Sequence, residues 1–315
     1  MRRLLALILL LALACGCATA GEPFFRIPEV LVVRMGNSVS ISYQKTRSAP
    51  AGRLLLKDAG GNLLAEAETA AGTAGGKIML KAGEVPEHGQ ELTLWFDYDG
   101  LTELQGKVLL AVDDRIPVIS RVETNEKKIA LTFDSTGSGV RADKLLDLLD
   151  RYGVKSTFFI QGGALKEKPE YALQVSKHGH ELANHSMYHP DMQEIGDNLI
   201  LRKIRNCNDI VRETTGQTVC LYRPPSGYYT YRDRAISRAL GCEVILWTFD
   251  SKDCAYWLPV ETILGRLLKK SEPGAIILMH DYGVCTIPAL ETYLPEMLAQ
   301  GYEFVTVSEL LKYRH

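Results

Sequence analysis

The sequence has no excess of charge of either sign, and this absence limits its possible partners. Its 315 residues carry 36 Lys and Arg against 38 Asp and Glu, a formal net charge of −2 at pH 7. Removal of residues 1–20 takes away two arginines and no acidic residue, which moves the net charge to −4. Nucleic-acid-binding domains usually carry clustered basic charge. The balance therefore argues against nucleic acid as a partner.

Long apolar runs are also missing after residue 20, so no later segment is apolar enough to be transmembrane. The run Leu4–Ala14 is too short to span a bilayer but suits a secretory signal, because it follows Met-Arg-Arg. Ala18-Thr-Ala20 offers an ordinary cleavage site, whereas Cys15 or Cys17 fits a bacterial lipoprotein box in which the cysteine is lipidated. Both endings of this leader (residues 1–20) remain open. Either predicts an exported protein, extracellular or anchored to the outer face of the membrane.

Paired cysteine motifs are absent from the rest of the chain. Five cysteines follow the leader and none forms a Cys-x-x-Cys pair, which argues against a cysteine zinc cluster. An odd number in an exported chain leaves at least one free thiol or an intermolecular bond.

Residues 22–115 are expected to form a small all-β domain. Short apolar segments, several of them alternating with polar residues, occur at 39–43, 54–56, 63–64, 92–98 and 108–112. A Gly-Gly turn at 58–62 predicts a hairpin between two of them. Several strands at this spacing without a helical segment indicate an immunoglobulin-like β-sandwich. A spacer or wall-proximal module is the preferred interpretation of its role, with sugar binding as the alternative.

Residues 118–315 show a different pattern, in which apolar strands alternate with helices. Seven strands are expected, at 128–133, 156–160, 180–184, 220–223, 243–249, 275–280 and 303–307. Such alternation predicts a parallel sheet, either open and doubly wound or closed into a barrel. Polar residues at or just after the strand ends favour the barrel, because its strands share one rim where such folds place their sites. These residues are Asp134, His185, Arg223, Asp250 and His280.

One ordered series of motifs stands out within this second domain. His185 and His189 are four residues apart, which on one face of a helical turn lets both imidazoles reach one cation. Zinc is the usual partner of neutral imidazole. The pair alone is a weak signal, but Thr132-Phe-Asp134 precedes it, and Arg223-Pro-Pro-Ser-Gly227 and Leu278-Met-His280-Asp281 follow it.

This series resembles the polysaccharide deacetylases of carbohydrate esterase family four, the NodB-homology domain, over roughly residues 118–312. The resemblance implies a distorted (β/α)₇ barrel and an exported hydrolase that uses one divalent metal, with Zn²⁺ as the metal that the family precedent favours. It implies removal of N-acetyl groups from peptidoglycan or a related N-acetylhexosamine glycan, with the cell-wall glycan as partner. It leaves open whether the sugar is N-acetylglucosamine or N-acetylmuramic acid.

The resemblance also assigns roles to single residues. Asp134 matches the catalytic base, and Arg223 matches the arginine that holds it ionised, with a fork suited to a bidentate contact. His280 matches the catalytic acid, tuned by Asp253 or Asp250, of which Asp253 is preferred. The backbone N–H of Ser226 matches an oxyanion donor, Leu278 the acetyl-methyl pocket, and His185 and His189 two metal ligands.

Two positions depart from the family pattern. Ser135 stands where the family has an aspartate that is the third metal ligand, and a neutral hydroxyl is a poor substitute. Ser135 could complete the site directly or through a water, Asp134 could turn to serve as a ligand, or the site could be impaired. Cys254 replaces a tryptophan of the family, for which Tyr256 or Trp257 could substitute as the wall that stacks on the sugar.

Three functions therefore remain in contention: an N-deacetylase, a catalytically impaired glycan-binding or scaffold protein, and an O-acetyl esterase of xylan-like chains. The first is preferred, while Ser135 and Cys254 favour the second. Cys254 and Cys285 each follow a strand with a polar end, and those two strands should be neighbours. A disulfide between them is expected, with two unpaired thiols as the alternative.

Overall fold

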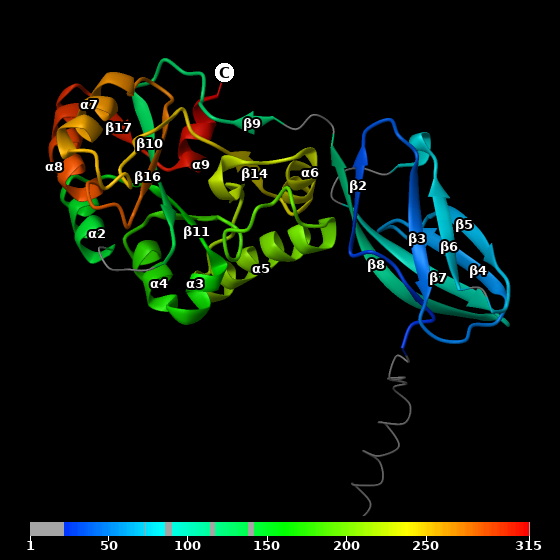
Figure 1. Ribbon diagram of the computed structural model, residues 1–315. Coiled ribbons are helices and arrows are strands. Elements are labelled where there is room, and N and C mark those ends of the chain that lie inside the picture. Colours follow the sequence, from blue (N-terminus) through cyan, green and yellow to red (C-terminus); the bar gives the residue numbers. More distant parts are fainter. Residues whose placement is uncertain (1–21, 73, 86–89, 114–116, 138–141, 315) are drawn as a thin grey trace, which may run out of the picture. The chain divides into compact units, whose positions relative to one another are not determined.

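A computed structural model describes residues 22–314, except residue 73 and segments 86–89, 114–116 and 138–141 (Figure 1). The chain divides into two compact units, the first containing most of the chain up to Leu109 and the second taking in 110–315. No helix among the described residues is both long and apolar enough to cross a membrane. The predicted leader, with Cys15 and Cys17, lies outside the described residues.

The first unit consists of β-strands and one short 3₁₀ helix, η1 (Ala82–Glu84). Its strands are β1 (Phe25–Arg26), β2 (Val30–Arg34), β3 (Val39–Lys45), β4 (Gly52–Lys57), β5 (Leu63–Thr69), β6 (Gly75–Leu80), β7 (Glu91–Tyr98) and β8 (Leu101–Asp113). They form two largely antiparallel sheets, in the orders β1-β3-β6 and β2-β8-β7-β4-β5. The apolar faces of the two sheets meet, since Phe25 and Phe96 pack edge to face with their ring centroids 5.0 Å apart.

The five strand segments expected in this unit lie in β3, β4, β5, β7 and β8. The 58–62 turn joins β4 to β5, and there the Asn62 backbone N–H donates to Asp58 Oδ1 at 2.8 Å. Strand β6 was not expected, although Ile78 and Leu80 alternate with exposed residues along it.

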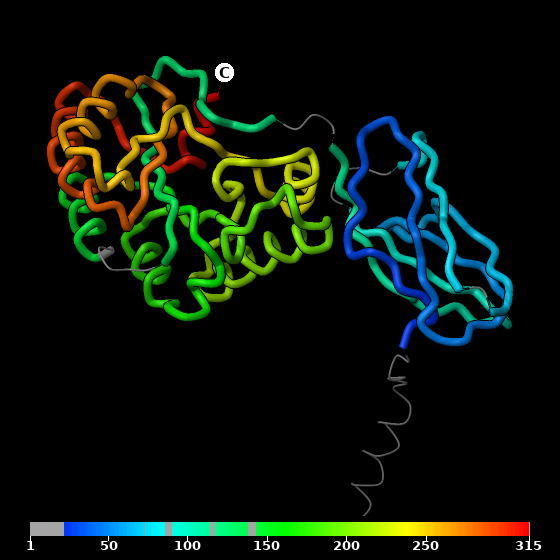
Figure 2. Tube along the Cα trace, in the orientation of Figure 1, coloured from blue at the N-terminus to red at the C-terminus, as the bar shows by residue number. Residues whose placement is uncertain are grey.

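The second unit contains a curved, mainly parallel sheet with helices around it (Figures 1 and 2). Its strands are β9 (Val118–Ile119), β10 (Lys128–Ser135), β11 (Thr157–Ile160), β12 (Glu181–Asn184), β13 (Leu221–Tyr222), β14 (Glu243–Ile245), β15 (Phe249–Asp250), β16 (Ile276–His280) and β17 (Glu303–Phe304). Its helices are α2 (Ala142–Arg151), α3 (Gly162–Glu167), α4 (Pro169–Lys177), α5 (Asp197–Thr215), η2 (Pro225–Gly227), α6 (Tyr231–Ala239), α7 (Val260–Lys270), α8 (Thr286–Ala299), α9 (Val307–Leu310) and η3 (Leu311–Tyr313).

The strand order β15-β16-β10-β11-β12-β13-β14-β9 leaves β15 and β9 at the ends of the sheet, and an isolated bridge between Arg121 and Ala275 links the segment after β9 to the residue before β16. Strands β14 and β15 follow one another along the chain, yet β14 pairs with β13 and β15 pairs with β16. The expected strand 243–249 is therefore interrupted at 246–248, and its two halves link opposite ends of the sheet. This arrangement is consistent with a distorted barrel.

Two boundaries differ from the sequence prediction for local reasons. The single helix expected before Gly179 is divided into α3 and α4, because Pro169 starts α4 and forces Lys168 out of helical geometry. The last strand ends at Phe304 rather than at Val307, because the Thr306 side chain caps α9 by accepting from the Glu309 backbone N–H at 3.2 Å.

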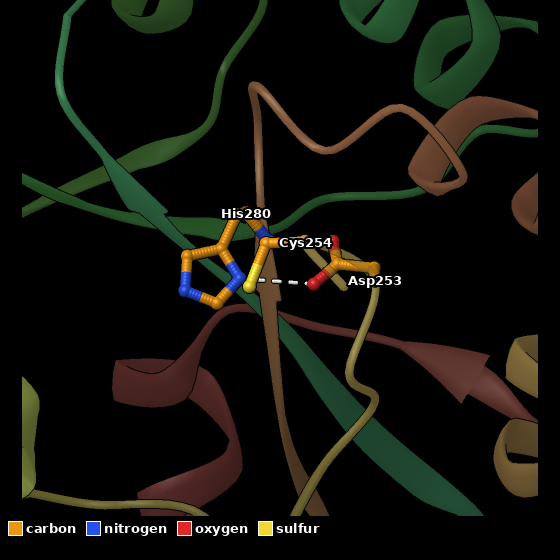
Figure 3. Close-up of side chains that lie close together, drawn as sticks. All are labelled: Asp253, Cys254 and His280. Carbon is orange, nitrogen blue, oxygen red and sulfur yellow. Dashed lines mark hydrogen bonds and ion pairs between the residues drawn. The ribbon is translucent and has the colours of Figure 1, made fainter. Parts of the chain in front are cut away.

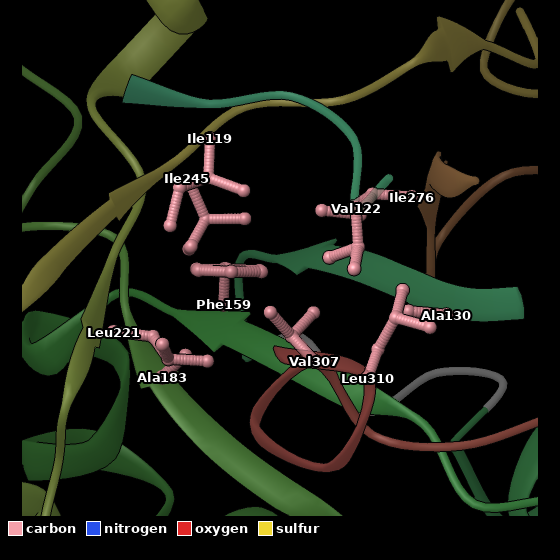
Figure 4. Packing of buried hydrophobic residues seen from close by; sticks show 10 residues of the cluster. All are labelled: Ile119, Val122, Ala130, Phe159, Ala183, Leu221, Ile245, Ile276, Val307 and Leu310. Carbon is pink, nitrogen blue, oxygen red and sulfur yellow. The ribbon is translucent and has the colours of Figure 1, made fainter. Parts of the chain in front are cut away.

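The apolar core of this unit lies inside the curved sheet (Figure 4). It contains buried residues from seven strands or their flanks together with two from α9, namely Ile119, Val122, Ala130, Phe159, Ala183, Leu221, Ile245, Ile276, Val307 and Leu310. Side chains from distant parts of the sequence thus close the barrel interior. The polar strand ends are left at the opposite, carboxyl edge of the sheet.

Candidate active site

The polar residues expected at the strand ends line one pocket of about 430 Å³. Parallel register places Asp134 of β10 beside His280 of β16, and Asp250 of β15 beside Leu278. The pocket is lined by Asp134, Ser135, Thr136, Gln161, His185, His189, Ser226, Trp247, Asp250, Cys254, Leu278, His280 and Tyr282. Seven of the nine predicted site residues line this pocket, and the other two, Arg223 and Asp253, contact the lining residues Asp134 and His280, as the barrel interpretation requires.

A buried ion pair between Asp134 and Arg223 forms the centre of this pocket. Arg223 Nη1 lies 2.7 Å from Asp134 Oδ1, and the guanidinium is fully buried. The contact is single rather than bidentate, because Arg223 Nε and Nη2 donate to the backbone carbonyls of Ile245 and Leu246. Burial favours the neutral acid, but His185 and Arg223 outweigh it and hold the pKa of Asp134 below its ordinary value. The carboxylate is therefore ionised at neutral pH.

The two histidines lie close together without being on a helix. His185 follows β12, and residues 186–188 form a turn in which Ser186 and His189 adopt positive φ angles of 65° and 55°. The helical turn expected there is wrong, yet the two imidazole centroids are only 5.2 Å apart. The turn is held because the N–H groups of Gly162 and Gly163 donate to the carbonyls of Ser186 and Met187.

The donor set of these histidines fits a divalent metal. His185 Nδ1 donates to the Arg223 carbonyl at 2.9 Å, which fixes the tautomer and leaves Nε2 with a free lone pair. That Nε2 lies 3.5 Å from Asp134 Oδ2. Burial lowers the pKa of His185, so its ring is neutral, as a metal ligand must be. His185, His189 and an adjacent carboxylate or hydroxyl could thus hold one cation.

Ser135 is turned toward a second carboxylate that sequence reasoning did not assign. Its hydroxyl donates to Asp281 Oδ2 at 2.6 Å and accepts from the Gly137 backbone N–H at 3.0 Å. Tyr171 OH, from α4, donates to the same Asp281 oxygen at 2.5 Å. Burial raises the pKa of Asp281, while the hydrogen bonds from Ser135 and Tyr171 oppose that rise. Ser135 itself lines the pocket.

His280 is held by Asp253 (Figure 3). Its Nδ1 donates to Asp253 Oδ1 at 2.9 Å, and the Thr286 hydroxyl donates to the other oxygen at 2.5 Å. Burial favours the neutral ring, but the hydrogen bonds with Asp253 and Cys254 outweigh it and raise the pKa of His280 to about 10. Asp253, not Asp250, contacts His280, while Asp250 turns to Lys252 at 2.7 Å. The ring is therefore protonated at neutral pH.

The remaining predicted residues lie around this centre. Ser226 has a φ of 57° within η2, and Leu278 is buried at the pocket wall. Tyr256 and Trp257, which were expected to replace the family tryptophan, are 80% and 71% exposed and do not line the pocket. Trp247 and Tyr282 line it instead. Trp247 was missed because it falls in the interruption between β14 and β15, which the sequence pattern does not indicate.

The expected disulfide between Cys254 and Cys285 is wrong. All five cysteines in the described part of the chain are unpaired. Strands β15 and β16 are neighbours as expected, but no bond joins the two thiols. Cys254 Sγ groups with Asp253 and His280 within 4.8 Å, whereas Cys285 Sγ lies 3.6 Å from the Leu258 carbonyl.

A lone buried histidine has no such role. His180 is buried against the Phe158 ring, and its Nδ1 accepts from the Ser156 backbone N–H at 3.3 Å. Burial lowers its pKa to about 4. It is a neutral structural histidine.

Comparison with known proteins places the second unit in one class of hydrolase. Residues 121–245 match the family model described as polysaccharide deacetylase. A peptidoglycan-N-acetylglucosamine deacetylase from Bacillus cereus is 35% identical over 198 residues, which are 62% of this chain and 92% of that protein. The chain belongs to the polysaccharide deacetylase family, carbohydrate esterase family four, whose deacetylases are hydrolases of carbon–nitrogen bonds.

Two further relatives show the range within the family. A peptidoglycan-N-acetylmuramic acid deacetylase from Bacillus subtilis is 32% identical over 62% of this chain, which spans only 41% of that longer protein. The solved structure of a family pseudoenzyme from Bacillus anthracis is 26% identical, with a TM-score of 0.61, over 71% of this chain and 85% of that one. The family thus contains both active deacetylases and a protein described as inactive.

Proposed function

We propose that the protein is an exported, divalent-metal-dependent deacetylase that removes N-acetyl groups from peptidoglycan or a related N-acetylhexosamine glycan. The observation that carries the proposal is that one pocket holds an ionised carboxylate and a protonated imidazole. Asp134 is held ionised by Arg223 on one side, and His280 is held protonated by Asp253 on the adjoining strand. Pairs of groups whose pKa values are pushed apart are typical of acid–base catalysis.

Asp134 would accept the proton of the attacking water. Its carboxylate faces the pocket and remains ionised at neutral pH, as a base must. The Arg223 contact to Oδ1 leaves Oδ2 on the side of His185, where it is available to the water.

His280 would donate a proton to the departing amine. Its Nδ1 is occupied by Asp253, so Nε2–H is the atom that can serve the substrate. The Ser226 backbone N–H would stabilise the oxyanion, and Leu278 would bound the space for the acetyl methyl group. The pocket thus offers a base, an acid, an oxyanion donor and an apolar wall within one volume.

A bound divalent metal, for which we propose zinc, would activate water and polarise the amide carbonyl. His185 and His189 would hold it, with Asp134 or Ser135 nearby. The fixed tautomer of His185 is the support for this assignment.

Acetate release from the chain 21–315 tests the proposal against its alternatives. We expect release from peptidoglycan and from chitooligomers, and none from the Asp134→Asn variant. Release from acetylated xylan alone would indicate the O-acetyl esterase. Binding to glycan without any release would indicate an impaired, glycan-binding relic. Analysis of the sugars in the products, for deacetylated glucosamine or deacetylated muramic acid, would identify the sugar that loses its acetyl group.

Export and the role of the first unit are proposals that rest on sequence. The leader would direct secretion or, through Cys15 or Cys17, lipid anchoring, and labelling with radioactive palmitate in a bacterial host distinguishes these. The first unit, as an immunoglobulin-like sandwich, would act as a spacer. Equal binding to peptidoglycan sacculi with and without residues 22–112 would support the spacer, and loss of binding would indicate a sugar-binding module.

A further inference from the structure

A buried carboxylate lies directly behind the pocket and is connected to it by one side chain. Asp281 is 4% exposed and is not among the residues that line the pocket. Its Oδ2 accepts from both Ser135 and Tyr171, while its Oδ1 has no hydrogen-bond partner among the described residues. Burying a carboxylate with one oxygen unpaired is costly unless a nearby positive charge compensates it. The unpaired oxygen therefore suggests that Asp281 interacts with a positive charge when the site is occupied.

The hydroxyl of Ser135 is fixed by its two neighbours. Its proton points to Asp281, and one oxygen lone pair accepts from the Gly137 N–H. A hydroxyl oxygen has two lone pairs, so one remains. Because Ser135 lines the pocket and Asp281 does not, the remaining lone pair has the pocket as its available direction.

We propose that Asp281 is a positioning residue that aims the Ser135 oxygen at the cation and supplies, from behind, the negative charge that a serine lacks. The pair Ser135–Asp281 would then replace the single carboxylate that the family pattern has at position 135. Tyr171 fixes the orientation of Asp281 by its hydrogen bond to the shared oxygen. The inference rests on the metal site of the proposed function, but it concerns metal affinity rather than turnover.

Charge and geometry both favour Ser135 as the ligand and Asp281 as the source of negative charge. A serine hydroxyl alone is a neutral ligand, and two histidines with it would form a site without an anionic partner other than Asp134. Asp134 is already paired with the buried Arg223. Asp281, in contrast, accepts hydrogen bonds from two hydroxyl groups, and the nearby charged ring of His280 is itself paired with Asp253. Its charge is therefore available to a cation in the pocket.

Zinc affinity of the mature chain, measured by competition with a chromogenic chelator, tests the proposal. We expect Ser135→Ala and Asp281→Asn each to weaken zinc binding about 10–100-fold, the usual cost of removing a partner that orients a metal ligand. The loss of affinity in the double variant should be smaller than the product of the two single losses, because Asp281 acts in part through Ser135. Losses that multiply in the double variant would overturn the proposal.

A matched control removes another buried carboxylate, Asp233, whose hydrogen bonds are made with Thr230. Asp233 caps α6 through Thr230 and has no contact with the pocket residues in the hydrogen bonds described. Asp233→Asn should keep the affinity of the wild type. An equal loss in this variant would assign the effect to general destabilisation and would also overturn the proposal.

A second pair of variants keeps the test decisive if Asp281→Asn alone does not fold. Ser135→Asp places two carboxylates in contact and should not bind zinc tightly by itself. Ser135→Asp with Asp281→Asn exchanges the positions of carboxylate and neutral partner, and should bind zinc more tightly than Ser135→Asp. Equal or weaker binding by the double variant would contradict the proposed role of Asp281.

Acetate release by the wild type, measured in parallel, separates this inference from the proposed function. If the variants lose zinc affinity in the coupled manner expected but the wild type releases no acetate, the proposed function is contradicted and the role of Ser135 and Asp281 in metal binding stands. If the wild type releases acetate but the variants keep the zinc affinity of the wild type, the proposed role of Asp281 is contradicted and the proposed function stands.

Discussion

Asp253 holds His280 with both of its carboxylate oxygens, one on the ring and one on the backbone. Oδ1 accepts from Nδ1 at 2.9 Å and Oδ2 accepts from the backbone N–H at 2.8 Å. The imidazole can therefore neither rotate nor shift along the strand without breaking a charge-assisted bond. The acid of the proposed reaction is thus positioned and charged by the same neighbour.

Asp253→Asn should move the basic limit of activity downward. The folded pKa of His280, about 10, lies above the ordinary value of 6.5, so the proton is held until the pH rises through that range. Without the carboxylate, the ring should lose its proton nearer to 6.5, and acetate release at pH 8 should fall. The pH profile of kcat/KM is the measurement, and an unmoved basic limb would contradict the pairing.

The same pair should add stability that depends on pH. Because the folded pKa of His280 is raised, its contribution is fully present below about pH 6.5 and is lost as the pH rises through about 10. Urea unfolding at pH 6 and at pH 10 should therefore show a larger difference for the wild type than for Asp253→Asn. Identical differences would show that the charge of His280 does not contribute.

Asp134→Asn and His280→Ala should each reduce acetate release on the order of 10²–10⁴-fold while the fold remains intact, because each removes a general base or acid. Circular dichroism would report the fold. Asp150→Asn, which alters a half-exposed carboxylate paired with His178 and Lys155, is the control and should retain activity. Turnover at the wild-type rate in either site variant would remove that residue from the mechanism.

His185→Ala with His189→Ala should abolish stoichiometric metal. The two ring centroids are 5.2 Å apart, His185 Nε2 lies 3.5 Å from Asp134 Oδ2, and the hydrogen bond to the Arg223 carbonyl fixes the tautomer of His185. Elemental analysis of the purified variant measures the metal, and His178→Ala serves as the control for loss of a histidine. Persistent one-to-one metal in the double variant would place the site elsewhere.

Alkylation of Cys254 should block the pocket. Its thiol is exposed, unpaired and part of the pocket lining, so a bulky thiol reagent would project into the substrate space. We expect inactivation of the wild type and of Cys220→Ser, whose replaced cysteine is the other exposed one. Cys254→Ser should resist the reagent. Equal sensitivity of both variants would place the reactive thiol outside the pocket.

Sequence reasoning located the strand-end residues because parallel strands bring their carboxyl ends together whatever the loops do. Asp134, His185, Arg223 and His280 follow this rule. It did not find the partner of Ser135, because the sequence does not show that β10 pairs with β16, the pairing that sets Ser135 beside Asp281, and because Tyr171 is 110 positions from Asp281. Contacts at that separation depend on how α4 packs, which no local pattern encodes. The helical turn at His185 failed for a related reason, since the backbone of 186–188 is held by α3.

The interruption of the strand between β14 and β15 has a consequence for redesign of the barrel. Arg223 uses the carbonyls of Ile245 and Leu246 as acceptors, and those carbonyls lie where β14 ends. If a continuous β-strand replaced the interruption, these two carbonyl oxygens would accept hydrogen bonds from a neighbouring strand instead. Two guanidinium donors would then be buried without an acceptor, and each unpaired group costs about 1–3 kcal/mol. The interruption between β14 and β15 therefore provides the acceptors that the buried Arg223 requires. A barrel with a continuous strand at this position would hold Arg223, and with it the Asp134 carboxylate, less well.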